Sequence, residues 1–117
     1  MPITLINSFV VPADQEDEFL RTWRDTIGHF TAAPGFIRTR LHRNTGLNDT
    51  TFQYVNVALW EDVESYRAVF RDFTPAGQRV SGVKAYPGLF EVYAEINAGD
   101  SGAGAVPGGD GDGGGRR

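Results

Sequence analysis

The stretch FQYVNVALW at residues 52–60, followed by EDVESY at residues 61–66, decides the fold of this chain. Its first nine residues alternate aromatic and β-branched side chains with smaller ones, which predicts a β-strand. Asn56 stands in the middle of that strand, although asparagine is depleted in strands because its amide competes with the ladder. Trp60 is four residues further on and therefore lies on the same face as Asn56.

The residues after this strand predict a helix that returns a phenol to it. Asp62 is a suitable N-cap for a helix over Val63–Phe70. Such a helix would bring Tyr66 back toward the strand it has just left. We therefore expect the amide of Asn56, the indole N–H of Trp60 and the phenol of Tyr66 to converge.

Composition limits the classes of protein to which the chain can belong. It has 117 residues and no cysteine, which fits one domain without disulfide or thiolate chemistry. The net charge is −4 and there is no basic stripe, so nucleic acid is not an expected partner. No apolar run approaches the ~20 residues that span a bilayer, and the N-terminus lacks a signal-peptide pattern. We expect a cytoplasmic protein that does not enter membranes.

The last 21 residues have a different composition from the rest. Residues 97–117 contain nine of the fifteen glycines and end in two arginines. Such a segment cannot bury enough apolar surface to offset the entropy lost on ordering. We predict one folded domain over residues 1–96, followed by a flexible glycine-rich C-terminal tail over residues 97–117.

The N-terminal third predicts a strand and then a long helix. The strand is expected over Ile3–Val11, with Asn7 as an amide within an otherwise apolar row. The helix is expected over Asp14–Thr31, with Asp14 as its cap. Apolar residues recur along it at helical spacing, and this stripe includes Trp23, which is therefore interpreted as a core residue.

The remaining elements are expected in the order strand, strand, helix, strand. Their predicted bounds are Phe36–Asn44, Phe52–Trp60, Val63–Phe70 and Leu89–Ile96. Residues 72–86 are weakly patterned, although Thr74-Pro75 could start a short additional helix. Pro87-Gly88 is interpreted as the turn that leads into the last strand.

This βαββαβ order predicts the α+β class, with the ferredoxin-like arrangement of a four-stranded antiparallel sheet. Two helices can cover only one face of that sheet. The strand over residues 52–60 is nevertheless apolar on both faces, whereas a wet face should carry polar residues. We therefore predict a homodimer in which a second copy of the chain covers the open face.

Four short motifs together resemble a known family. They are LIN at 5–7, PGF at 34–36, VNVALW at 55–60 and LFEV at 89–92. At this spacing the chain resembles the antibiotic biosynthesis monooxygenase (ABM) domain over roughly residues 3 to 96. That family forms dimeric α/β barrels, so the resemblance implies the same fold and homodimer.

The resemblance also implies an activity and a set of site residues. One subgroup contains small cofactor-free monooxygenases of aromatic polyketide pathways, which oxidise anthrone-type phenols. The residues implicated in that subgroup fall here on Asn56, Trp60 and Tyr66, which become the catalytic candidates. The arginine of the subgroup is not in register, because Val80 occupies its position and Arg79 is the neighbour.

Further residues are candidates for binding the substrate. They are Asn7, Phe9, Tyr54, Phe70 and Arg79. Strand parity is compatible with Asn7 and Asn56 facing one cavity but leaves the question open. Each candidate also has a structural interpretation, in which the amides satisfy neighbouring backbone groups and the rings pack in the core.

Three functions remain open at this level. The first is a cofactor-independent monooxygenase that oxidises an aromatic polyketide-like phenol or anthrone with O₂. The second is a ring-opening oxygenase of the same family that uses reduced FMN or FAD. Because the sequence has no glycine-rich phosphate loop after a strand, the flavin would enter as a loosely held co-substrate. The third is a non-catalytic dimeric module that binds a small molecule.

Haem and metal sites are not expected. Members of another ABM subgroup degrade haem with a histidine after the second helix, but residues 73–83 contain no histidine. The two histidines, His29 and His42, lie in other predicted elements, and haem iron requires an axial ligand. We therefore disfavour haem.

Overall fold

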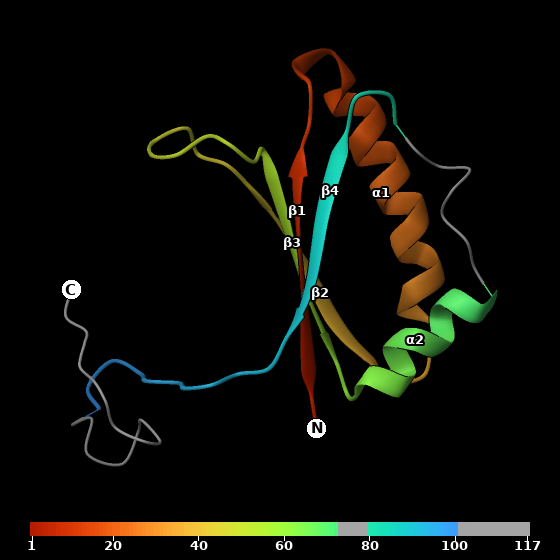
Figure 1. Ribbon diagram of the computed structural model, residues 1–117, viewed down its shortest axis with the longest axis vertical. Helices are drawn as coiled ribbons and strands as arrows, with labels where there is room; N and C mark the ends of the chain where they lie inside the picture. The colour runs from red at the N-terminus through yellow and green to blue at the C-terminus, as the bar shows by residue number, and fades with distance from the viewer. Residues whose placement is uncertain (73–79, 101–117) are drawn as a thin grey trace.

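A computed structural model describes residues 1–72 and 80–100 of the chain (Figure 1). Four strands and two helices follow one another in the predicted order. Their bounds are β1 Ile3–Val10, α1 Glu16–Thr31, β2 Phe36–Arg43, β3 Tyr54–Trp60, α2 Val63–Asp72 and β4 Lys84–Phe90. Within the described residues no helix is long and apolar enough to cross a membrane.

The strands form one antiparallel sheet in the order β2-β3-β1-β4. β1 and β3 occupy its centre, as expected for the two strands with the most apolar sequences. This order and the two helices confirm the predicted ferredoxin-like α+β fold. β3 alternates fully buried with half-buried residues along its whole length, so only one of its faces is covered within the chain.

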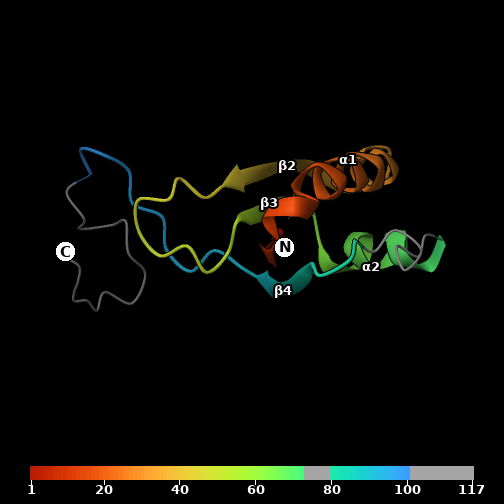
Figure 2. The ribbon, with the colours of Figure 1, turned by 90° about the horizontal axis from the view of Figure 1, so that it is seen from above.

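Both helices lie on the same side of the sheet (Figure 2). α2 begins as the sequence predicts, because Asp62 Oδ1 accepts a hydrogen bond of 2.8 Å from the backbone N–H of Ser65. This bond to the ionised form lowers the pKa of Asp62. The predicted cap of α1 is wrong: Asp14 lies in a 3₁₀ turn over Ala13–Gln15, and α1 starts at Glu16 without a side-chain cap.

Two hydrophobic clusters fill the space between the sheet and the helices. The first contains Leu5, Phe30, Ala58 and Trp60, and the second contains Val11, Phe19 and Tyr54. Aromatic rings meet edge to face in both clusters, which is a preferred geometry for ring pairs. The clusters fix α1 against β1 and β3.

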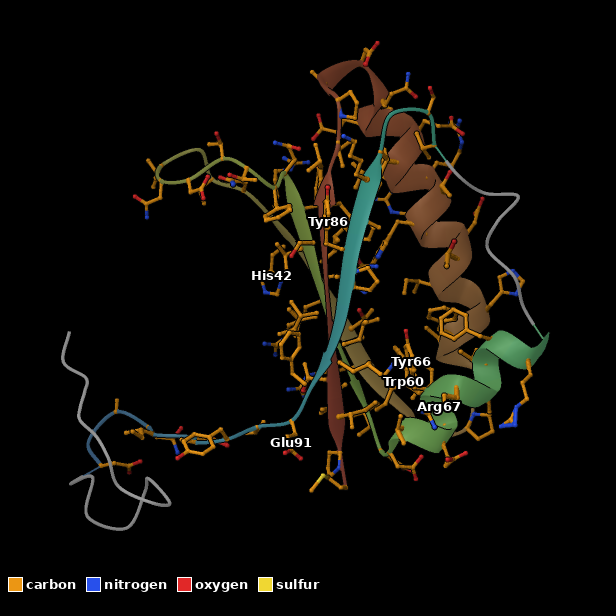
Figure 3. All side chains as sticks on the ribbon, viewed as in Figure 1. His42, Trp60, Tyr66, Arg67, Tyr86 and Glu91 are labelled. Carbon is orange, nitrogen blue, oxygen red and sulfur yellow. The ribbon has the colours of Figure 1, made fainter. Side chains whose placement is uncertain are left out.

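The last strand differs from the prediction over Leu89–Ile96. β4 ends at Phe90, and the residues from Glu91 onward leave the sheet (Figure 3) and are exposed. Pro87 is therefore inside the strand, where it pairs with Asn7, and not in a turn before it. Proline is tolerated here because β4 is an edge strand and has a neighbour on one side only.

Two other predictions concern residues outside those that the structure describes. The short helix expected from Thr74-Pro75 falls in the undescribed segment 73–79, and so does Arg79. Most of the predicted tail, from residue 101 onward, is likewise undescribed. The domain boundary after residue 96 stays a prediction.

Candidate functional site

A cavity of about 1000 Å³ lies between the helix-facing side of the sheet and the two helices. Its floor comes from β1, β3 and β4, and one wall comes from α1. Most of the lining side chains are apolar or aromatic, among them Phe9, Phe19, Ile27, Phe30 and Phe70. A cavity of this size and character, with a few polar groups, is the usual form of a small-molecule site.

Two asparagines lie side by side on the floor of this cavity. Asn7 of β1 is the register partner of Asn56 of β3, and both line the cavity. Opposite residues of an antiparallel pair have Cβ atoms about 5 Å apart on the same face of the sheet. The question that strand parity left open is thereby answered, because both amides face one cavity.

The two amides have different surroundings. Asn56 is only 6 % exposed, and its Oδ1 accepts a hydrogen bond from the hydroxyl of Thr39 on β2. Asn7 Oδ1 is buried and has no hydrogen-bond partner among the described residues. A buried polar atom without a partner is unfavourable by about 1–3 kcal/mol, so its presence here indicates a group that a ligand can satisfy.

Tyr66 contributes a phenol to the cavity, from α2. The side chain is partly buried, and this burial raises the pKa of its phenol. The phenol therefore stays protonated at neutral pH and can donate a hydrogen bond or a proton.

Trp60 lies near this group but does not line the cavity. Its side chain is 0 % exposed, and its ring meets that of Tyr66 edge to face, with centroids 5.8 Å apart. Figure 3 shows both rings on the helix side of the sheet, near α2. Trp60 Nε1 has no hydrogen-bond partner within the described part of the chain. Of the three groups expected to converge, the structure therefore places the amide of Asn56 and the phenol of Tyr66 at the cavity and the indole of Trp60 behind the phenol.

The predicted substrate-binding residues separate into three groups. Phe9 and Phe70 line the cavity, as does Asn7. Tyr54 lies outside the lining, where its hydroxyl donates to the Glu16 carboxylate at the start of α1. Burial, more than this carboxylate, raises the pKa of Tyr54. Arg79 is outside the described residues.

The sequence interpretation missed the contribution of α1 to the site. Trp23, assigned to the core, lines the cavity, and its buried Nε1 has no partner among the residues that the structure describes. Thr22 and Thr26 line the cavity beside it. Two threonines four residues apart on the edge of an apolar stripe are the signal that could have shown a wet face there.

The ionisable groups of the site are few. No group of three or more His, Cys, Asp or Glu side chains that could hold a metal ion occurs within residues 1–72 and 80–100. Both histidines of the chain lie in that part, and neither lines the cavity. The cavity therefore presents amides, a protonated phenol and aromatic walls, which suit a flat ligand with oxygen substituents.

Known proteins share sequence with this chain. The sequence profile of the family described as antibiotic biosynthesis monooxygenase matches residues 2–72. Deoxynogalonate monooxygenase from Streptomyces nogalater is 37 % identical over 68 residues, which is 56 % of this chain. Those residues cover 52 % of that relative, so the chain spans about half its length.

Solved structures show the same fold. The structure of SnoaB, a cofactor-independent oxygenase from Streptomyces nogalater, superposes with a TM-score of 0.59 at 26 % identity, over 85 % of this chain and 98 % of SnoaB. A haem-degrading protein of Mycobacterium tuberculosis gives a TM-score of 0.59 at 23 % identity, over 83 % of this chain and 100 % of its own. The latter likeness concerns the fold alone.

Proposed function

Because the chain belongs to the antibiotic biosynthesis monooxygenase family, we propose that it oxidises an aromatic, polyketide-like phenol or anthrone with O₂. In this proposal the reaction needs neither a metal nor a tightly bound cofactor. The observation that carries it is the pair of amides, Asn7 and Asn56, on the floor of an aromatic cavity. The relation to SnoaB, a cofactor-independent oxygenase, supports the same class of reaction.

The chemistry depends on an electron-rich substrate. A phenol next to an activated CH₂ group loses a proton to give a delocalised carbanion, whose negative charge rests largely on oxygen. This anion passes one electron to O₂, and the resulting radical and superoxide combine to a C–O–O bond, which takes up a proton. Loss of water then converts CH₂ to C=O, so one oxygen atom enters the product and the other leaves as water.

The cavity residues take the following roles in this proposal. The amide of Asn56 donates to the oxygen on which negative charge develops, as neutral donors do in oxyanion sites. The protonated phenol of Tyr66 donates to the substrate carbonyl or supplies a proton to the peroxide. Asn7 binds a second oxygen substituent, and Phe9 and Phe70 exclude water from the anion.

The proposal assigns no haem to the cavity. Haem iron is held by an axial side chain, most often a histidine, and neither His29 nor His42 lines the cavity. His42 lies on the opposite side of the sheet from Tyr66 (Figure 3). The haem-degrading neighbour shares the fold, and at 23 % identity this likeness carries no argument about the ligand.

The Asn56→Ala variant tests the proposed reaction. The wild type, stripped of metal and flavin, should consume oxygen with dithranol above the spontaneous rate and form the quinone. Loss of the preorganised donor should lower this rate by about 10²-fold. An oxygen electrode and the visible absorption of the quinone measure it, and Asn48→Ala, in an exposed loop, is the matched control.

Other outcomes would contradict parts of the proposal. A wild type that consumes oxygen only when reduced FMN or FAD is added would overturn the cofactor-free assignment. A wild type that binds dithranol without turnover under either condition would identify a binding module.

We also propose that the protein acts as a homodimer whose open sheet faces pack together. Neither helix covers the face that carries Val57, which is half-buried in the single chain (Figure 2). Tyr86 and Phe90, at the β4 edge of this face, are 53 % and 52 % exposed. The β3 and β4 part of this face is apolar, whereas β2 adds Arg38, Arg40 and His42 to it. An apolar area with a charged border is typical of an interface with a second copy.

Replacing Val57 with lysine should disrupt this dimer. The charge would be buried without a partner at the centre of the interface, which is strongly unfavourable. Light scattering coupled to size-exclusion chromatography at micromolar concentration should give the molar mass of two chains for the wild type and of one chain for Val57→Lys. The control Ala32→Lys adds the same charge at the exposed end of α1 and should stay dimeric. A monomeric wild type would contradict the interface.

A further inference from the structure

Thr39 is the neighbour that determines how the Asn56 amide is oriented. In the β2–β3 register Thr39 pairs with Ala58, two residues from Asn56 and on the same face of the sheet. Its Oγ1 donates a hydrogen bond to Asn56 Oδ1. Thr39 is half-buried and is not among the residues that line the cavity. The hydroxyl thus acts on the site only through Asn56.

This hydrogen bond distinguishes the two ends of the amide. β3 lies between β2 and β1 in the sheet, so an Oδ1 held toward Thr39 directs the NH₂ group away from β2 and toward the side of Asn7. A side-chain amide carries an acceptor at one end and two donors at the other. With its acceptor occupied, Asn56 offers donors to the cavity.

Asn7 provides the contrast within the same site. Its Oδ1 is buried without a partner in the described residues, so no hydrogen bond of that atom fixes the direction of its amide. Asn7 can therefore offer either end to a ligand, whereas Asn56 is restricted to one. A donor that is already aimed needs no reorganisation when negative charge develops, and it stabilises that charge more strongly.

We propose that Thr39 is a positioning residue, which holds Asn56 so that the cavity prefers an anionic oxygen at its NH₂ group. As a contribution to turnover, this inference rests on the proposed oxygenase function. As a preference for the ionised form of a bound phenol, it can be tested without turnover. Without the Thr39 hydroxyl the amide could rotate and present Oδ1, which repels an oxyanion.

Three variants at and around this position test the inference. Thr39→Val keeps the branched shape of the side chain and removes only the donor, and Thr39→Ser keeps the donor. Thr4→Val makes the same change on the other face of the sheet, where Thr4 pairs with Leu59 of β3. Emodin, a hydroxyanthraquinone whose visible spectrum changes on ionisation, is the probe for binding, and dithranol is the substrate for turnover.

The expected result has two parts. The pKa of bound emodin should be about one pH unit higher in Thr39→Val than in the wild type, which corresponds to a tenfold weaker preference for the anion. With dithranol, kcat should fall about tenfold while KM stays within about twofold, because the interaction strengthens only as charge develops. Thr39→Ser should restore both quantities, and Thr4→Val should match the wild type.

A different pattern would overturn the inference. If Thr39→Val lowers thermal stability but leaves the pKa of bound emodin unchanged, Thr39 is a structural residue only. If the wild type shows no oxygen uptake and the pKa of bound emodin still depends on Thr39, the positioning role stands and the oxygenase function fails. The two proposals therefore fail in distinguishable ways.

Discussion

Replacing Trp60 with alanine should lower the free energy of unfolding by about 4 kcal/mol, as for other large core aromatics. Its side chain is 0 % exposed, and its ring contacts those of Phe30, Phe36 and Tyr66 at centroid distances of 6.1, 5.2 and 5.8 Å. Alanine would leave a cavity among these three aromatic rings, which are fixed by the sheet and both helices. Urea denaturation followed by circular dichroism measures the loss.

The variant Trp60→Phe separates packing from chemistry at this position. It keeps an aromatic ring in the cluster and removes the indole N–H, which has no hydrogen-bond partner among the described residues. If that N–H serves the reaction through Tyr66, oxygen uptake falls while most of the stability remains.

For the alanine variant, a loss of less than about 1 kcal/mol in the free energy of unfolding would contradict the prediction, because it would show that the Trp60 ring is not embedded as the structure describes.

Replacing Gly35 with alanine should lower the free energy of unfolding by about 3 kcal/mol, from backbone strain and steric overlap together. Gly35 has a φ of 86°, and a Cβ there would lie 2.1 Å from Ser65 Oγ and 2.3 Å from Ser65 Cβ. The overlap cannot be relieved by rotating a side chain, because Ser65 Cβ is attached directly to the backbone of α2. Thermal and urea unfolding measure the change.

A second glycine provides the matched control for this prediction. Gly46 has a φ of 83°, but nothing lies within 4 Å of a Cβ built there. Gly46→Ala should therefore show the backbone strain alone, about 1–2 kcal/mol. Equal losses at the two positions would show that Gly35 does not touch α2. This contact fixes the position of α2, which carries Tyr66 into the cavity.

Hydrophobic periodicity predicted the order and type of the elements because each of them buries one continuous face. The alternation in residues 52–60 gave the central strand, and the four-residue spacing of Asn56 and Trp60 placed them on one face. The shared cavity of Asn7 and Asn56 required the pairing of β1 with β3, which strand parity alone could not establish.

The prediction of the last strand was wrong because a local pattern competed with a pairing partner. Within residues 89–96 every second residue from Phe90 to Ile96 is apolar, as on one face of a strand, yet β1 pairs with Lys84–Phe90. From the sequence, Pro87 is interpreted as part of a turn before the strand, although an edge strand has one side on which an N–H is not needed. The position of β4 at the edge of the sheet follows from the order of the strands, and the sequence of one segment does not reveal that order.

The helix wall of the cavity and the link from Thr39 to Asn56 were also beyond sequence reasoning. A tryptophan on an apolar helical stripe has the same pattern whether it fills a core or lines a cavity. Trp23 is distinguished by the empty space beside it and by its N–H, for which residues 1–72 and 80–100 supply no partner. The hydrogen bond from Thr39 to Asn56 joins two residues that are 17 positions apart on neighbouring strands. The alternation of side chains along each strand does not predict this bond.

The amide of Asn7 has a consequence for any effort to make this protein more robust. Its Oδ1 is buried at the centre of the sheet without a partner among the described residues, and an aliphatic side chain there would remove that penalty. The site thus keeps the fold below the stability that its own backbone permits. Selection for heat resistance alone would be expected to favour apolar replacements at this position and to remove the amide from the candidate site in the process.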